Sequence, residues 1–558
     1  MQNFSSILLD HFHKHPQKTI ITLLSGTDPD DPITYQQLLQ RSSAYTKQLM
    51  DQGVKSGDVV IIILQHGDDL IYAYWGAILL GAIPSIMPFL TEKLLSDRYR
   101  SDLSALIDHT KPVGIITYSD FEDEVRTAIP ADQQIKMVLS EMVDLSQTLD
   151  LQTLSGLSCS ADEVVLLQHS SGTTGLQKGV ALSHHAVQRQ LDVYGDSLHL
   201  TEDDVIISWL PLYHDMGLIA CFIMPILKGV HTVLMSPFEW VRAPYRLMQA
   251  ISNFKGTLVW LPNFAYAFCS QKIRDRQLEG CRLDSLRAVI NCSEPTRLQS
   301  HQKFAARFEP YGLNPAALLT CYAMAENVFA VTQATLGEDV PLDIIDKFIF
   351  TEQHQAAPPT TQENAMTFLS AGPLLPNVQV KILSPENQEL PDRQVGEIAL
   401  KSDCMLSGYY HRPDITQKAF HKGFFLTGDY GYMVEGNLYV SGRKKDLIIV
   451  GGKNIYPQDI ETLVMEIDGV HPGRVCAFGI FNENAGTEDV VVVAEVDTKD
   501  PDEQIAISDT VRKHVTKESA VALRHVHVVK GPWLAKTSSG KISRSANREK
   551  YVKEVLGE

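Results

Sequence analysis

A run of small, hydroxyl-bearing and basic residues is the most specific chemical signal in the sequence. Ser170-Ser-Gly-Thr-Thr-Gly-Leu-Gln-Lys-Gly-Val180 directly follows the apolar run Val164–Gln168. Glycines let backbone N–H groups approach an anion closely, hydroxyls add donors, and Lys178 adds a point charge. The pattern is not G-x-x-x-x-G-K-[ST], so it is not a Walker A loop. It predicts a phosphate cradle, and a flexible surface turn is the weaker interpretation.

Other charged groups stand in short motifs further along the chain. Asp429 lies in Thr-Gly-Asp, Arg443 in Gly-Arg-Lys-Lys-Asp, and Lys541 in Ser-Ser-Gly-Lys. Taken alone, each has an ordinary interpretation, because Asp is common in turns and a lysine in such a turn is usually exposed. His214 precedes Asp215, and the two could form a structural pair. These residues become informative only together.

The elements that must position these groups alternate along the chain. Short β-branched runs are separated by amphipathic stretches such as Gln36–Gly53 and Arg242–Phe254. This alternation predicts an α/β fold with parallel sheets covered by helices on both faces. The expected strands are Val59–Leu64, Val113–Thr117, Val164–Gln168, Val205–Trp209, Thr232–Met235, Thr257–Leu261 and Arg287–Asn291.

The pattern changes towards the C-terminus. Closely spaced strands predict a smaller β-rich subdomain over about 378–441, and the cationic segment 441–446 resembles a linker. We therefore expect a large N-terminal domain, residues 1–444, built of several subdomains. Residues 445–558 are long enough for an independent α+β domain.

Composition excludes some classes of protein. Of 558 residues, 49 are Lys or Arg and 67 are Asp or Glu, a net charge of −18, which argues against general nucleic-acid binding. The eight cysteines form no C-x-x-C pair and predict reduced core thiols in a cytoplasmic protein. The uncharged run Leu70–Thr91 contains Gly and Pro, so we expect a buried helix and a strand there, not a membrane span.

Seven motifs in order give the chain a family resemblance. The Ser170 segment is followed by Trp209-Leu-Pro-Leu-Tyr-His-Asp-Met-Gly-Leu218, and then by shorter motifs. The remaining motifs are Asn291-Cys-Ser-Glu-Pro295, Cys321-Tyr-Ala-Met-Ala-Glu326, Thr427-Gly-Asp-Tyr-Gly431, Gly442-Arg-Lys-Lys-Asp446 and Ser538-Ser-Gly-Lys-Ile-Ser-Arg544. Together the seven motifs resemble the adenylate-forming acyl and aryl ligases, the group with acyl-CoA synthetases, luciferases and peptide-synthetase adenylation domains.

The resemblance implies ATP and Mg²⁺ as cofactors and assigns residues to them. Lys541, His214 and Lys178 are the implied catalytic residues, and Glu326 and Thr174 would hold the metal. Lys541 would bridge the substrate carboxylate and the α-phosphate, where its charge is electrostatically useful. The implied ATP- or AMP-binding residues are Ser170, Ser171, Gly172, Thr173, Thr174, Gly175, Ser293, Glu294, Pro295, Tyr322, Ala323, Asp429 and Arg443.

Individual roles follow the family. Tyr322 would stack on adenine, although alone it would suit a core position. Asp429 would accept hydrogen bonds from the ribose hydroxyls, and Arg443 would contact ribose or phosphate. Lys445 lies where the family hinges its small domain, so rotation there would separate two half-reactions.

Several features are most similar to the fatty acyl-AMP ligases, which pass acyl groups to acyl carrier proteins. Aromatic residues around Phe264 and Tyr266 fit an acyl pocket, although core packing predicts the same residues. The stretch of about 336–364 resembles the insertion that in this branch hampers thioester formation with CoA; a tolerated surface insertion is the alternative. We expect a fatty acid substrate and a separate carrier protein, stand-alone or linked to a polyketide synthase, as in polyketide or lipopeptide biosynthesis.

Alternatives remain open at this point. A fatty acyl-CoA ligase would use CoA as acceptor, and a catalytically silent nucleotide-binding relative would retain only part of the chemistry. Amino-acid activation is weaker, since Asp215 belongs to the fatty-acyl-like motif. The chain departs from the family at Gln177, Ala323 and Ala535, where proline, glycine and proline are usual. Because the charged positions are retained, these changes should affect loop stiffness more than catalysis.

Overall fold

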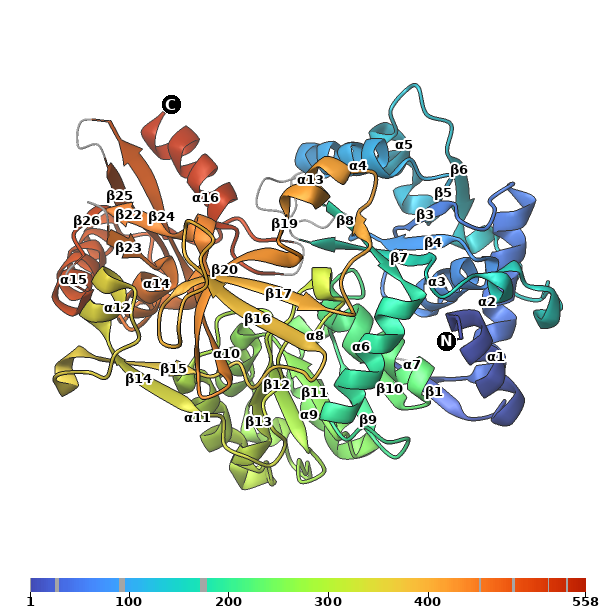
Figure 1. Cartoon of the computed structure of the whole chain (residues 1–558), viewed down its shortest axis with the longest axis horizontal. Helices are drawn as coiled ribbons and strands as arrows, with labels where there is room; N and C mark the ends of the chain where they lie inside the picture. Colours follow the sequence, from blue (N-terminus) through green and yellow to red (C-terminus); the bar gives the residue numbers. More distant parts are fainter. Residues whose placement is uncertain are drawn as a thin grey trace. The chain divides into compact units, whose positions relative to one another are not determined.

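The computed structural model describes residues 2–25, 30–89, 96–170, 178–450, 453–483, 487–519, 521–537 and 540–557. The chain divides into two compact units. Unit 1 comprises Met1–Pro341, Ala371–Gln379 and Lys401–Gly423, and unit 2 comprises Leu342–Ser370, Val380–Leu400 and Phe424–Glu558. Figure 1 shows the elements of both in sequence colours. The predicted boundary at 444/445 falls inside unit 2 and stays a prediction.

Unit 1 is built on two mainly parallel sheets. The larger has the order β13-β12-β11-β9-β10-β1-β2, in which only the β1–β2 pair is antiparallel. Its strands are β1 Thr19–Leu24, β2 Asp31–Thr34, β9 Val205–Ser208, β10 His231–Met235, β11 Leu258–Leu261, β12 Ala288–Asn291 and β13 Leu318–Thr320. The smaller has the order β4-β3-β5-β6: β3 Val59–Ile62, β4 Ile83–Ile86, β5 Gly114–Thr117 and β6 Lys136–Leu139.

Helices cover these sheets because the strands are apolar on both faces. All four residues of β3, β5, β11 and β12 are buried. The main helices are α1 Phe4–Lys14, α2 Tyr35–Asp51, α3 Asp68–Leu80, α4 Ser96–Thr110, α5 Glu122–Ala128, α6 His184–Ser197, α7 Met224–Lys228, α8 Pro237–Arg242, α9 Tyr245–Phe254, α10 Asn263–Lys272 and α11 Leu298–Phe308. The predicted α/β class is confirmed, and six of the seven expected strands lie in parallel pairs. The prediction was wrong for Val164–Gln168, which belongs to β7 Val164–Ser170 and pairs antiparallel with β8 Lys178–Ser183.

The apolar helix α3 explains the uncharged run Leu70–Thr91. Every residue from Leu70 to Leu80 is buried, and β4 follows directly, as the sequence predicted. Gly76 permits a close crossing with α2, since a Cβ there would lie 2.6 Å from the Cβ of Tyr45. Among the residues that the structure describes, no helix has the length and apolar character needed to cross a bilayer.

A small antiparallel sheet joins distant parts of unit 1. It has the order β18-β8-β7, with β7 Val164–Ser170, β8 Lys178–Ser183 and β18 Gly408–Tyr409. Tyr409 is paired with Val180, and Ser170 with Lys178. The helix α13, Pro413–Lys418, follows β18. This sheet brings residues near 409 beside the start of β8.

Unit 2 contains most of a second, antiparallel sheet and the C-terminal part of the chain. The first has strands in the order β16-β17-β20, with β21 paired to β20: β16 Val378–Leu383, β17 Gly396–Ser402, β20 Phe424–Val434 and β21 Asn437–Arg443. A hairpin of β14 Leu342–Asp346 and β15 Ala365–Leu369 adjoins it in sequence, with α12 Lys347–Gln353 between them.

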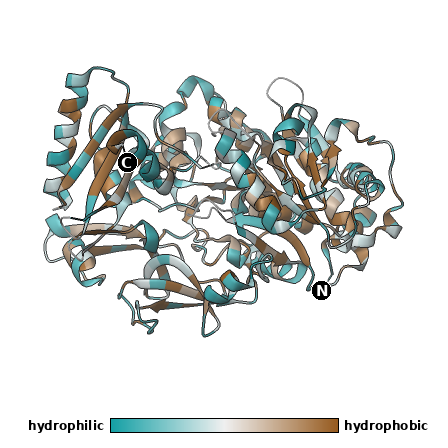
Figure 2. Ribbon diagram, turned by 90° about the horizontal axis from the view of Figure 1, so that it is seen from above, coloured by the Kyte–Doolittle hydropathy of each residue, from teal (hydrophilic) through white to brown (hydrophobic). Residues whose placement is uncertain are grey.

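The C-terminal part of unit 2 has the sheet order β24-β25-β26. Its elements are β22 Ile448–Val450, β23 Lys453–Ile455, α14 Pro457–Met465, β24 Val470–Asn482, β25 Thr487–Val496, α15 Pro501–Ser519, β26 Leu523–Lys530 and α16 Arg544–Tyr551. The long helix α15 links the parallel strands β25 and β26. Figure 2 shows brown, apolar strands in these sheets and teal, polar residues on many of the helices.

Candidate active site

Four predicted site segments follow neighbouring strands of one sheet. The segments with His214, Phe264, Ser293 and Tyr322 come after β9, β11, β12 and β13, which are adjacent and parallel. The carboxyl ends of parallel strands lie at one edge of a sheet, where open α/β folds bind ligands. The topology therefore gathers residues that are more than a hundred positions apart in the chain.

Contacts between these segments confirm the gathering. The carboxylate of Glu294 accepts a hydrogen bond from the backbone N–H of Phe264 at 3.0 Å. The hydroxyl of Ser293 lies 3.9 Å from the sulfur of Met216, two residues after His214. Ser293 has a φ of +71°, an uncommon value for a residue with a side chain. Pro295 is exposed.

Glu326 is a buried carboxyl group held by a tyrosine. It is 8% exposed, and its Oε1 accepts a hydrogen bond from the hydroxyl of Tyr409 at 2.8 Å. The ammonium group of Lys178 lies 4.7 Å from the ring centroid of Tyr409, a cation–π contact. Two predicted site residues, Glu326 and Lys178, thus contact the same tyrosine.

The electrostatics of this cluster are mixed. Burial raises the pKa of the Glu326 carboxyl, the hydrogen bond from Tyr409 and the charge of Lys178 lower it, and the charge of Asp215 raises it. The net pKa of Glu326 lies above its ordinary value. A cation near Glu326 would favour the ionised carboxylate.

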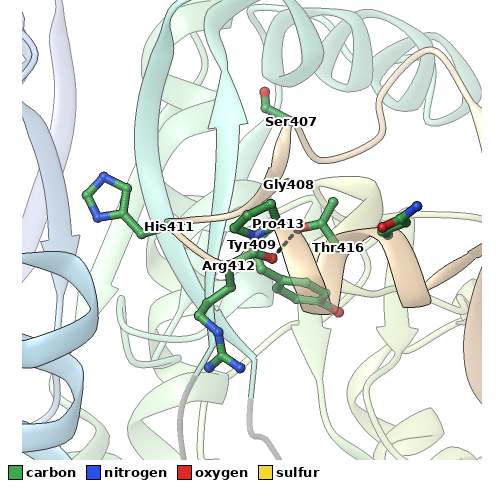
Figure 3. A pocket seen from close by; sticks show the side chains of 8 residues that line it. Ser407, Gly408, Tyr409, His411, Arg412, Pro413 and Thr416 are labelled. Atoms are coloured by element: carbon green, nitrogen blue, oxygen red, sulfur yellow. Dashed lines mark hydrogen bonds between the residues drawn. The ribbon is translucent and has the colours of Figure 1, made fainter.

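A hollow adjoins Tyr409. It has a volume of about 400 Å³ and is lined by side chains from the segment 407–417, as Figure 3 shows. The backbone N–H of Tyr409 donates to the Thr416 hydroxyl at 2.9 Å, the dashed line in the figure. This bond fixes β18 against α13 and so helps to orient Tyr409.

His214 and Asp215 are in direct contact, as the structural-pair interpretation of the sequence requires. Nδ1 of His214 lies 2.6 Å from Oδ1 of Asp215, and that oxygen also accepts from the N–H of Met216 at 2.8 Å. The side chains are 23% and 12% exposed. The pair directly precedes the π-helix Met216–Ile223, all of whose residues are buried.

Tyr322 and Ala323 lie in a turn closed by backbone hydrogen bonds. The N–H of Tyr322 donates to the Thr332 hydroxyl at 3.0 Å, and its carbonyl accepts from the N–H of Val331 at 2.8 Å. Ala323 bridges Ala330. The Tyr322 side chain is half-buried, which is compatible with stacking on a base.

Aromatic rings surround Phe264. The indoles of Trp209 and Trp240 stack at 3.6 Å, and Phe264 meets both edge-on at 6.1 and 6.2 Å. Phe264 is half-buried, whereas Tyr266 is fully buried, stacks on His301 and donates its hydroxyl to the Val289 carbonyl at 2.9 Å. Tyr266 is therefore packed like a core residue, which was the alternative interpretation of its sequence position. The acyl-pocket prediction depends mainly on Phe264.

In unit 2, Asp429 and Arg443 are cross-strand neighbours. They are paired in the register of β20 and β21, and Nε of Arg443 lies 3.5 Å from Oδ1 of Asp429. Asp429 is 16% exposed and Arg443 is 50% exposed. The next residue, Lys444, forms an ion pair with Glu397 at 2.8 Å. Lys445 lies in the following 3-10 turn, Lys444–Asp446.

Backbone contacts lie on both sides of Lys541. Lys536 pairs with Ile542, and the backbone N–H of Thr537 donates to the Lys541 carbonyl at 2.7 Å. The Lys541 N–H donates to the Thr537 hydroxyl at 3.2 Å. Gly540 has a φ of +85°, which glycine adopts without strain. The backbone of Lys541 is thus held by hydrogen bonds to Thr537.

Most of the predicted phosphate loop lies outside the described residues. Ser171, Gly172, Thr173, Thr174 and Gly175 belong to this part, so the cradle and the second metal residue stay predictions. The structure describes its borders: Ser170 ends β7 and Lys178 begins β8.

The described residues suit a magnesium nucleotide. Glu326 supplies one oxygen ligand, the type that Mg²⁺ prefers. Within the described part of the chain, no three His, Cys, Asp or Glu side chains gather into a metal-binding group. Mg²⁺ commonly uses one or two carboxylates together with substrate phosphates and water, so this arrangement fits Mg²⁺ bound with ATP.

The fold and the site define a nucleotide-binding α/β enzyme of the adenylate-forming class. The family model described as "AMP-binding enzyme" matches residues 8–410. This chain therefore belongs to the AMP-binding enzyme family, and the resemblance inferred from the motifs is confirmed.

Named relatives are similar over nearly the whole chain. The medium-chain-fatty-acid–[acyl-carrier-protein] ligase JamA of Moorena producens is 29% identical over 99% of this chain and 96% of its own length. The long-chain-fatty-acid–AMP ligase FadD26 of Mycobacterium bovis is 30% identical over 98% and 96%. A crystal structure of fatty acid AMP ligase from Legionella pneumophila is 29% identical, with a TM-score of 0.75, and covers 100% and 96% of the two chains.

Sequence reasoning missed Tyr409. It lies 83 positions from Glu326, and only the pairing of β18 with β8 brings it to the site. No local pattern reports such a contact. The Gly-Tyr-Tyr run at 408–410 was the one available signal, since a glycine before aromatic residues often marks a close backbone approach.

Proposed function

We propose that this enzyme activates a fatty acid with ATP. A carboxylate oxygen of the fatty acid attacks the α-phosphorus of ATP, the bond to the bridging β-phosphate oxygen breaks, and pyrophosphate leaves. The observation that carries the proposal is the cluster of site segments after β9, β11, β12 and β13, with Glu326 and Lys178 on Tyr409. The names of the relatives support a fatty acid as substrate.

Residue roles follow from position and charge. Lys541 and Lys178 stabilise the negative charge on the reacting phosphate. Glu326, together with Thr174, would hold Mg²⁺, which would neutralise charge on the phosphates. His214, fixed by Asp215, adjoins the substrate carboxylate.

Ligands are held by the other assigned residues. Tyr322 with Ala323 packs on adenine, and Asp429 with Arg443 binds the ribose. Ser293–Pro295 and the loop that starts at Ser170 complete the nucleotide site, and Phe264 lines the acyl pocket.

For the second step we propose transfer to the phosphopantetheine thiol of a separate carrier protein. The thiolate attacks the acyl carbon, the bond to the adenylate oxygen breaks, and AMP leaves. Rotation at Lys445 would separate the two steps. The name of JamA supports a carrier protein as acceptor. We also retain the prediction of a cytoplasmic enzyme, for which the eight free cysteines are a supporting observation.

Contacts of the insertion 336–364 support a carrier over CoA. Its helix α12 places the ring of Phe350 5.6 Å from that of Tyr456, beyond the proposed hinge. The ammonium group of Lys347 donates to the Glu518 carbonyl at the end of α15, at 3.0 Å. These contacts would restrain the C-terminal region from moving into the pose that CoA requires.

The acceptor is tested by product analysis. Enzyme, ATP and labelled fatty acid are incubated with CoA or with a phosphopantetheinylated carrier protein. We expect acyl-AMP to accumulate with CoA and acyl-carrier to form with the carrier. Lys347→Ala should raise the acyl-CoA yield, while the control Lys381→Ala, which removes the surface ion pair with Glu389, should not. Efficient acyl-CoA formation by the wild type would establish the CoA ligase alternative instead.

A further inference from the structure

Arg544 is a half-buried cation that binds two carboxylates. Its Nη1 donates to Oδ2 of Asp446 at 2.9 Å, and its Nε and Nη2 donate to the two oxygens of Glu461 at 2.9 and 2.7 Å. Burial lowers the pKa of Arg544, but Glu461 and Asp446 raise it more, so the guanidinium stays charged. A fork-like bidentate pair of this kind fixes geometry as well as charge.

The three residues come from three separate elements of unit 2. Asp446 directly follows Lys445, the proposed hinge. Glu461 lies on α14, and its Oε1 also accepts from the N–H of Ala477 on β24 at 3.0 Å. Arg544 begins α16, three positions after Lys541. The ion network therefore connects the hinge, the C-terminal sheet and the loop of Lys541.

The residues just before the hinge are held elsewhere. Lys444 forms its ion pair with Glu397 on β17, and Arg443 lies beside Asp429 on β20. Lys445 thus stands between one residue anchored to the β-rich strands and one anchored to Arg544. A change of φ and ψ at Lys445 would then rotate the C-terminal part as a whole, because the residues on both sides of Lys445 are anchored.

We propose that Arg544 is a positioning residue that makes the far side of the hinge and the Lys541 loop one rigid body. The inference rests on the proposed function, since Lys541 must reach the reacting phosphate. Arg544 itself touches no substrate in this scheme. It determines where Lys541 lies after each hinge movement, and so it affects the transition state more than the binding of ATP.

The test compares Arg544→Lys and Asp446→Asn with a matched control. Arg512→Gln is that control: Arg512 is an arginine of α15 whose Nη1 donates to the carbonyls of Leu523 and Arg524, away from the hinge. In fatty-acid-dependent ATP–pyrophosphate exchange we expect kcat to fall about tenfold or more in both test variants, with KM for ATP within about threefold of the wild type. The control should match the wild type.

A second readout does not depend on activity. The segment Arg443-Lys444-Lys445 is exposed and offers three trypsin sites. We expect trypsin to cut there several-fold faster in Asp446→Asn and Arg544→Lys, because the anchor after the hinge is weakened. Asp446→Asn keeps the ion pair between Arg544 and Glu461. We therefore expect this variant to fold even if Arg544→Lys does not, so the test does not depend on the arginine variant.

The outcomes separate the two proposals. Wild-type kcat and wild-type trypsin rates in both test variants would overturn the positioning role alone. Variants that show a higher KM for ATP and a lower melting temperature, but no loss of kcat, would also overturn the positioning role. Such a result would mean that Arg544 only stabilises the fold. A wild-type enzyme without exchange would refute the proposed function, and the positioning role with it.

Discussion

Replacing Tyr409 with Phe isolates one hydrogen bond in the site. The hydroxyl of Tyr409 donates to Glu326 at 2.8 Å, and the two residues are only 6% and 8% exposed. A buried acceptor that loses its donor costs about 1–3 kcal/mol. The Phe ring keeps the contact with Lys178, which is 4.7 Å from the ring centroid in the native chain. The substitution therefore removes the bond alone.

The expected effect can be measured by calorimetry. For a unit of this size, about 1–3 kcal/mol corresponds to a fall of roughly 1–4 °C in melting temperature. Because Glu326 is the proposed magnesium ligand, the Mg²⁺ concentration for half-maximal exchange should rise as well. The melting temperature of Tyr409→Leu should fall further, since this variant also loses the ring that faces Lys178.

The adjacent tyrosine provides the control. Tyr410 stacks on His411 at 4.2 Å and packs against a small hydrophobic cluster that includes Leu167 and Ala181. Tyr410→Phe should leave the melting temperature and the Mg²⁺ requirement unchanged. If Tyr409→Phe behaves like this control in both measurements, the contact between Tyr409 and Glu326 does not support the site, and the reasoning is wrong.

Three further changes test other parts of the account. Lys541→Met should lower kcat of exchange by about 10²–10³ without unfolding the loop, since backbone bonds close it; an unchanged kcat would exclude the catalytic role. Asp429→Asn should weaken ATP binding about tenfold in a calorimetric titration, and unaltered affinity would contradict the ribose role. Burial lowers the pKa of His301 from 6.5 to about 4. As the pH falls, His301 is therefore protonated at a higher pH in the unfolded chain than in the folded protein. The stability from neutral His301 is complete above pH 6.5 and is lost towards pH 4. Between pH 7 and 5 the wild type should lose about 2 kcal/mol more unfolding free energy than His301→Gln, and equal losses would show that His301 is not responsible.

Periodicity and turn residues predicted most of the fold. Each of the seven expected strands of the N-terminal part overlaps an observed strand, because buried strands leave a strong apolar signal. Six of them lie in parallel pairs as expected, whereas β7 is antiparallel, a difference that an apolar run does not report. The insertion 336–364, read as a polar stretch, contains β14 and α12. The strand β14, Leu342–Asp346, is buried mainly on one face, and an alternating run of only five residues gives a weak sequence signal.

The site was predictable as a set of motifs but not as a set of contacts. His214, Ser293 and Glu326 were found because each follows a strand with a characteristic motif. Tyr409 and the network of Arg544 were not, because their partners lie 83 to 98 positions away in the chain. Only tertiary pairing brings them together, so no local pattern could reveal them.

The most direct test of the central claim is fatty-acid-dependent ATP–pyrophosphate exchange by the full-length protein with Mg²⁺. The account predicts that labelled pyrophosphate enters ATP only when a fatty acid is present, and that acyl-AMP can be isolated from the same mixture. It also predicts that Lys541→Met lowers both signals by about 10²–10³. Exchange that is absent with every fatty acid, or that persists unchanged in Lys541→Met, would contradict the account.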